Sequence, residues 1–231
     1  MEQILLDWGE AIPAHVAVPA GDATVAGVIV LHEIFGLNAD IRRIADRFAA
    51  AGYLAVAPDL YAHQGMRPFC VLRTFLTLGR GSGPAVDMIE ATRAWLAKHP
   101  RVDASRIGVA GFCMGGSFAL LFAARAPLGA AACFYGAVPE RAEELEGICP
   151  VVAGYGERDR LFAPAGRRLE RLLATLGVEH DVVVYPDVGH SYMNRHDGCL
   201  NWLGAVSPMH VGYDEAAAED SWRRMLGFFG R

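Results

Sequence analysis

Six short apolar runs rich in β-branched residues alternate with helix-like stretches along this chain, and this alternation narrows the possible folds more than any other feature. Each run is apolar over nearly its whole length, which is typical of strands buried on both faces of a sheet. The runs occupy residues 24–33, 53–60, 106–113, 131–137, 150–157 and 180–187. Strands and helices in alternation predict an α/β fold with a mostly parallel central sheet and helices on both faces.

The stretches between the runs have the pattern of helices. Four of them are followed by a glycine or a proline, which commonly ends a helix. The predicted helices are Ala39–Ala51, Pro84–His99, Gly116–Ala126, Ala163–Leu176 and a last one over Asp214–Phe229. Residues 15–19 (HVAVP) are interpreted as an antiparallel edge strand.

Two long segments depart from this rhythm, at about 61–83 and 191–213. Long irregular segments in a compact domain are often functional, for example as covers over a site. A chain of 231 residues suits one α/β domain with a sizeable core. We therefore expect a single domain over residues 1–231 that carries two cover segments.

Charge and cysteine usage exclude several classes of function. The net charge is −5, with both signs interspersed, so no basic surface for nucleic acid or for a membrane is expected. The first ten residues do not have the pattern of a secretory signal, and the longest apolar stretch is too short to span a bilayer. Five irregularly spaced cysteines favour reduced thiols, and none has zinc-site spacing. We expect a cytoplasmic monomer or weak homo-oligomer without metal or cofactor.

Residues 106–125 (RIGVAGFCMGGSFALLFAAR) predict a buried strand, a tight turn and a helix. The turn has the form G-x-nucleophile-x-G, with Cys113 between Gly111 and Gly115. Small neighbours are needed because the chain passes close to itself at such a strained turn. The helix that follows directs its N-terminus at the thiol, where it stabilises a thiolate or an oxyanion. Cys113 is therefore a candidate nucleophile.

Reactive residues follow three further strands, at Glu33, Asp159 and His190. In an open α/β sheet, functional residues gather beyond the carboxyl ends of the strands. The order Cys113, Asp159, His190 is the nucleophile–acid–histidine order of the α/β-hydrolase fold. Asp187 is an alternative acid, and three other histidines are alternative bases. These histidines are His180, His196 and His210.

The motifs HEIFGLN, APDLYA, GFCMGG, GERD and GHSY together resemble the dienelactone hydrolase family, carboxymethylenebutenolidase-like enzymes of the α/β-hydrolase fold. The resemblance covers essentially the whole chain. It implies that Cys113 is the nucleophile, His190 the base and Asp159 its orienting acid. It also implies an oxyanion hole formed by the backbone N–H groups of Ile34 and Met114.

Glu33 matches the glutamate that this family holds beside its cysteine. By the same resemblance, substrate binding rearranges the pair, so that the reactive thiolate forms only when it is needed. A permanently activated thiolate is prone to oxidation, which gives this control a physical purpose. His32, the residue before Glu33, is interpreted as structural.

The reaction expected from these residues is hydrolysis of a lactone or activated carboxylic ester through a thioester acyl-enzyme. By resemblance, arginines of the covers hold a substrate carboxylate, and Arg195 and Arg73 are the candidates here. Tyr135 and Ser191 are further candidates for binding a small ester or lactone. Two alternatives stay open: a general carboxylesterase, and a redox-sensing thiol protein that pairs Cys113 with a cysteine of the covers.

Overall fold

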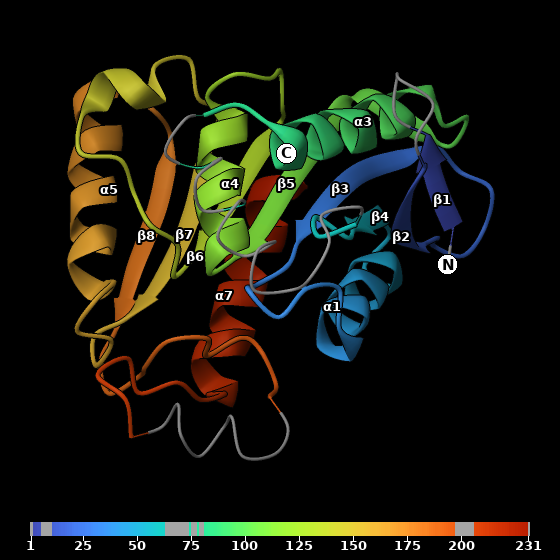
Figure 1. Ribbon diagram of the computed structural model, residues 1–231. Helices are drawn as coiled ribbons and strands as arrows, with labels where there is room; N and C mark the ends of the chain where they lie inside the picture. The colour runs from blue at the N-terminus through green and yellow to red at the C-terminus, as the bar shows by residue number, and fades with distance from the viewer. Residues whose placement is uncertain are drawn as a thin grey trace.

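The computed structural model describes residues 2–5, 11–62, 74, 78, 81–196 and 206–230. An eight-stranded sheet with the order β1-β2-β4-β3-β5-β6-β7-β8 forms its centre (Figure 1). The strands from β3 onward run parallel, whereas β2 is antiparallel to both β1 and β4. The strands are β1 (Glu2–Leu5), β2 (Ala11–Ala17), β3 (Val25–Leu31), β4 (Leu54–Pro58), β5 (Val102–Phe112), β6 (Ala130–Phe134), β7 (Val151–Gly156) and β8 (His180–Tyr185).

The six apolar runs all form strands, which confirms the prediction of a mostly parallel sheet. Two details of the prediction are wrong. Residues 15–17 belong to an antiparallel strand, but β1 pairs outside it, so β2 is not at the edge. Strand β8 is only half-buried along its length, because it forms the opposite edge and has a neighbour on one side.

Helices cover both faces of the sheet, as the sequence predicts. In Figure 1, α3, α4 and α5 lie on one face, and α1 and α7 on the other. On the second face, the Phe48 ring of α1 lies 4.8 Å from the Trp222 ring and 6.0 Å from the Phe229 ring of α7. The helices are α1 (Ala39–Ala50), α3 (Pro84–Lys98), α4 (Met114–Ala123), α5 (Ala163–Leu176) and α7 (Glu215–Phe229). A short 3-10 helix, η1, spans Ala142–Leu145.

The order of the strands brings two distant parts of the chain together. After β3 the chain adds β4 on one side, and later adds β5 on the other side of β3. The end of β3 pairs with the end of β5, with Leu31 opposite Gly111. Glu33 and Cys113, each two residues further on, therefore lie at the same edge of the sheet. Such a switch point is where α/β sheets form their sites.

The two predicted covers are described only in part. Most of the segment 61–83, including Arg73, lies outside the described residues, as do residues 197–205 of the segment 191–213. The division into one domain with two covers stays a prediction. Among the helices that the structure describes, none is both long and apolar enough to cross a membrane.

Candidate active site

Cys113 sits at the turn between β5 and α4 with φ of +52° and ψ of −115°, a backbone conformation that side-chain-bearing residues rarely adopt. The flanking glycines allow this turn. A Cβ atom on Gly111 would lie 2.0 Å from the carbonyl oxygen of Gly115, and one on Gly115 would lie 2.3 Å from that of Leu31. The Cys113 N–H donates to the Phe134 carbonyl at 3.0 Å and fixes the turn against β6. The chain therefore holds the thiol in a strained, reproducible position.

His190 and Asp159 form a buried pair beyond the ends of β8 and β7. The imidazole Nδ1 lies 2.6 Å from Asp159 Oδ2. The other carboxylate oxygen, Oδ1, accepts backbone N–H groups of Leu161 and Phe162 at 3.1 and 3.2 Å. Asp159 is thus oriented from one side and orients His190 on the other, which leaves Nε2 to exchange a proton.

The alternative acid and two of the alternative histidines lie in other settings. Asp187 is exposed in a turn with φ of +59°. His180 begins β8, and its Nδ1 lies 2.7 Å from the Val178 carbonyl oxygen. The Nδ1 of His210 lies 3.3 Å from an Arg158 guanidinium nitrogen. The third alternative, His196, contacts Glu33 instead.

Two aromatic rings flank His190. The rings of Tyr135 and Phe162 each lie 5.0 Å from the imidazole, measured between ring centroids. Backbone hydrogen bonds tie the residue to the end of the second cover, with the His190 N–H 2.8 Å from the Met209 carbonyl oxygen. The imidazole therefore has little freedom to leave Asp159.

The thiol of Cys113 is held neutral by its surroundings. Burial raises its pKa most, and the nearby charge of Glu33 raises it further. The backbone N–H groups of Met114 and Ile34 donate toward the sulfur and lower the pKa, but they do not offset the rise. The structure thus brings the two N–H groups of the predicted oxyanion hole to the sulfur of a protonated thiol.

A hydroxyl group holds the Ile34 peptide in place. The Tyr61 O–H donates to the Ile34 carbonyl oxygen at 3.0 Å, and it also lies 3.5 Å from Met114 Sδ. This contact orients the Ile34 peptide. Tyr61 stands in the motif APDLYA but was not singled out from the sequence, since nothing local links it to residues 34 and 114.

Glu33 is fully buried, and both carboxyl oxygens have a neighbour from the loop after β8. Ser191 Oγ donates to Oε1 at 2.5 Å, and His196 Nε2 lies 3.3 Å from Oε2. Burial raises the pKa of Glu33 from an ordinary 4.5 to about 8; the hydrogen bond from Ser191 opposes this rise, and the charge of Asp40 adds to it. Glu33 is therefore mainly a neutral carboxylic acid at pH 7.

His32 holds the backbone beside this glutamate. Its Nδ1 lies 2.6 Å from the Glu33 carbonyl oxygen, and its Nε2 accepts the Leu60 N–H at 3.0 Å. Burial lowers the pKa of His32, so the ring stays neutral and makes one bond as donor and one as acceptor. These contacts agree with a structural role.

A polar network under the site links residues that the sequence did not connect. The Tyr135 O–H donates to Asn194 Oδ1, and Asn194 Nδ2 donates to Asp40 Oδ2 at 2.9 Å. Asp40 also pairs with Arg43 at 2.7 Å. Tyr135 and Ser191 both have positive φ, +43° and +56°, so strain gathers here as it does at Cys113. Asn194 and Asp40 were missed because their contact spans 154 positions.

The predicted substrate-binding residues have different placements. Tyr135 and Ser191 are buried beside His190 and Glu33. Arg195 is exposed, and its guanidinium carbon lies 4.7 Å from the centroid of the Tyr213 ring. Arg73 lies outside the described residues, as do Cys70 and Cys199, the candidate partners of Cys113 in the redox alternative. The assignment of both arginines stays a prediction.

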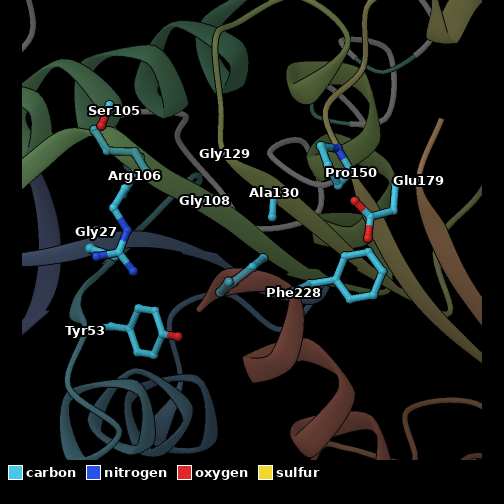
Figure 2. Close-up of a pocket in the computed structure, with 13 residues that line it drawn as sticks. Gly27, Tyr53, Ser105, Arg106, Gly108, Gly129, Ala130, Pro150, Glu179 and Phe228 are labelled. Atoms are coloured by element: carbon cyan, nitrogen blue, oxygen red, sulfur yellow. The ribbon is translucent and has the colours of Figure 1, made fainter. Parts of the chain in front are cut away.

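A surface pocket of about 180 Å³ lies away from these residues, at the amino ends of the strands (Figure 2). Its lining includes Gly27 and Ala130, near the starts of β3 and β6, Arg106 of β5, and Phe228 from the end of α7. Sites in this class of sheet form at the carboxyl ends. The candidate active site is therefore the cluster around Cys113 rather than this pocket.

Known proteins resemble this chain over nearly its full length. A carboxymethylenebutenolidase of Rhodococcus opacus is 32% identical over 219 residues, which cover 88% of this chain and 80% of that protein. A Salmonella typhimurium protein, provisionally named a carboxymethylenebutenolidase, is 31% identical over 240 residues, which cover 96% and 84%. A solved structure from Klebsiella pneumoniae has a TM-score of 0.79 at 29% identity and covers 100% of this chain and 98% of that one.

The model of the dienelactone hydrolase family matches residues 12–231, which include every strand from β3 onward and all of the site residues above. Relatives of this kind are hydrolases of esters and lactones. The fold, the order of the site residues along the chain and these similarities agree. The chain belongs to the dienelactone hydrolase family.

Proposed function

We propose that this enzyme hydrolyses a lactone or an activated carboxylic ester through a thioester on Cys113. One observation carries the proposal: a thiol in a strained turn receives two backbone N–H groups at the same sheet edge as a buried histidine–aspartate pair. Family membership supports ester or lactone hydrolysis as the reaction class. The thioester and the assignment of the triad are our proposal.

In the first half of the reaction, the Cys113 thiolate attacks the carbonyl carbon of the substrate. Negative charge then develops on the carbonyl oxygen, and the N–H groups of Ile34 and Met114 stabilise it. The tetrahedral species expels the alkoxide or enolate and leaves an acyl group on sulfur. An enolate leaves easily, whereas an amide nitrogen does not compete with a thiolate as leaving group, so enol lactones and activated esters suit this site.

In the second half, a water molecule attacks the thioester. His190 Nε2 takes the proton of this water, and Asp159 stabilises the imidazolium that forms. The same oxyanion hole holds the second tetrahedral species, which expels the thiolate and releases the acid. Glu33 controls the first half, because the thiol needs a proton acceptor before it can attack.

The proposal is tested by incubating the purified protein with an enol lactone, a set of aryl esters and a matched amide. We expect rapid turnover of the lactone and the activated esters and none of the amide. Intact-mass spectrometry after rapid acid quench should find the acyl mass added, and peptide mapping should place it on Cys113. Turnover without an acyl group on Cys113 would overturn the thioester.

We predict that Arg195→Met lowers kcat/KM for an anionic lactone about two- to fivefold and leaves its neutral methyl ester nearly unchanged. Arg195 is exposed, so water and salt screen its attraction for a substrate carboxylate and keep the loss small. The measurement is kcat/KM for both compounds with both proteins. Equal losses on the charged and the neutral compound would exclude a carboxylate-binding role and favour a general esterase.

A further inference from the structure

Glu33 connects the thiol to a second imidazole that the mechanism above does not use. His196 reaches Glu33 Oε2 at 3.3 Å, while Ser191 occupies Oε1. Both partners come from the loop after β8, more than 150 positions away from Glu33. Both side chains of the Glu33–His196 contact are at most 8% exposed, so water does not readily replace either partner.

The groups around Glu33 differ in the charge that they can take up. Ser191 and Tyr135 are hydroxyl groups, Asp40 is an acid that raises the pKa of Glu33, and Cys113 is the thiol to be activated. Arg43 is engaged by Asp40. Among these neighbours in the described part of the chain, His196 is the group that becomes positive when it accepts a proton. The His196 ring packs edge-on against the Phe35 ring, with 5.1 Å between the ring centroids, and this contact keeps the imidazole in place.

Activation of the thiol poses a problem that Glu33 alone does not solve. A carboxyl group that is already protonated at neutral pH has no negative charge with which to accept the thiol proton. A carboxylate at Glu33 would accept the thiol proton directly, but the buried cluster would then carry one negative charge before and after the transfer, which burial disfavours. A neutral Glu33 acts as base only if it releases one proton as it gains another.

We propose that His196 is the relay residue that receives this proton. The S–H bond of Cys113 breaks as an O–H bond forms on Oε1 of Glu33. The O–H bond on Oε2 breaks as an N–H bond forms on His196 Nε2. The products are a thiolate, a neutral Glu33 and an imidazolium, so the buried cluster has zero net charge before and after the transfer. The proton returns by the same route when the thioester is hydrolysed.

The contact has a geometry that suits a relay. At 3.3 Å, the Oε2–Nε2 pair is within ionic contact but is not aligned as a hydrogen bond. Misalignment leaves a buried carboxyl oxygen poorly satisfied, which costs free energy. A small rotation of the carboxyl or the ring forms the bond, so the transfer can take place in the free enzyme. The relay rests on the proposed role of Cys113 as nucleophile.

The test compares His196→Gln with the wild type by the rate at which iodoacetamide alkylates Cys113. Glutamine retains a side chain that donates a hydrogen bond to Glu33, but it cannot take up a proton. We expect the alkylation rate at pH 7 to fall about tenfold, which corresponds to roughly one pKa unit in thiolate formation. The difference should shrink above about pH 8, where Glu33 loses its proton to solvent without a relay.

A matched control is available on the surface. His15 Nε2 pairs with Asp46 Oδ1 at 2.7 Å, a histidine–carboxylate contact that is not part of the active site. His15→Gln should alkylate at the wild-type rate and turn over substrate normally. Folding of both variants is checked by thermal unfolding, and His196→Asn is the second variant if His196→Gln is unstable.

The outcomes separate the relay from the proposed function. An alkylation rate in a folded His196→Gln or His196→Asn variant equal to that of the wild type would overturn the relay, whatever the turnover. Slower alkylation at pH 7 that recovers at high pH supports it, even if no ester in the panel is hydrolysed and the proposed function fails. Equal slowing at every pH would indicate a structural role and overturn the relay.

Discussion

Replacing Cys113 with alanine should reduce lactone and ester hydrolysis to the background rate, a loss of at least roughly 10³-fold in kcat. Removing the nucleophile of a catalytic triad costs about this much or more, because the covalent route is lost and only substrate binding and the oxyanion hole remain. The turn geometry belongs to the backbone and to Gly111 and Gly115, so the variant should fold normally. The measurement is kcat on the best substrate with both proteins.

Serine at the same position provides the sharper comparison. It keeps a nucleophilic atom of similar reach, but an alcohol is far harder to deprotonate than a thiol, and the Glu33 site is neutral at pH 7. Cys113→Ser should therefore be much slower than the wild type. If Cys113→Ala and the wild type have equal activity, Cys113 is not the nucleophile. A peroxide-induced disulfide at Cys113 would then favour the redox alternative.

The strands and helices could be predicted because their burial and their ends depend on residues that are close in sequence. Runs such as 24–33 and 106–113 are apolar over nearly their whole length, which strands between two layers of helices require. The helix ends also followed local signals, since Gly177 takes a left-handed conformation with φ of +67° at the end of α5. The short strand β1 was not predicted, because four residues are too few for a period to stand out.

The turn that holds Cys113 was predictable for a similar reason. The spacing of Gly111, Cys113 and Gly115 reflects a close approach of the chain to itself, which side chains would block. Chain order and strand ends made His190 and Asp159 the candidates, the family resemblance assigned them as base and acid, and the structure brings the two side chains together. Their catalytic roles remain a proposal that the substitutions described here test.

Contacts between distant segments could not be predicted in this way. Asn194 meets Tyr135 and Asp40, and His196 meets Glu33, through residues 193–196, which follow the GHSY motif and have no period or motif of their own. His196 was considered only as a rival to His190. Its position beside Glu33 depends on the course of residues 190–196 after β8, which is fixed by tertiary hydrogen bonds such as that from His190 to Met209.

Glu33→Gln should lower kcat by roughly 10²–10⁴-fold, the range that general base catalysis contributes, with much less change in the KM of the substrate. Glutamine preserves the shape of Glu33 and can still accept the hydrogen bond from Ser191. It cannot receive the thiol proton, so the thiolate no longer forms on demand. An unchanged kcat would assign Glu33 to structure and leave His190 as the base for both halves of the reaction.

For the stability of the same variant, we expect a gain relative to the wild type as the pH rises. The pKa of Glu33 is raised from about 4.5 in the unfolded chain to about 8 in the folded protein, so the folded state binds the extra proton between these pH values. The contribution of Glu33 to stability is therefore fully present below about pH 4.5 and is lost as the pH rises toward 8. Glutamine does not titrate, so Tm of Glu33→Gln relative to the wild type should increase steadily over this range. A Tm difference that is constant with pH would show that Glu33 is ionised in the folded enzyme, and a carboxylate already present at pH 7 would accept the thiol proton without any relay.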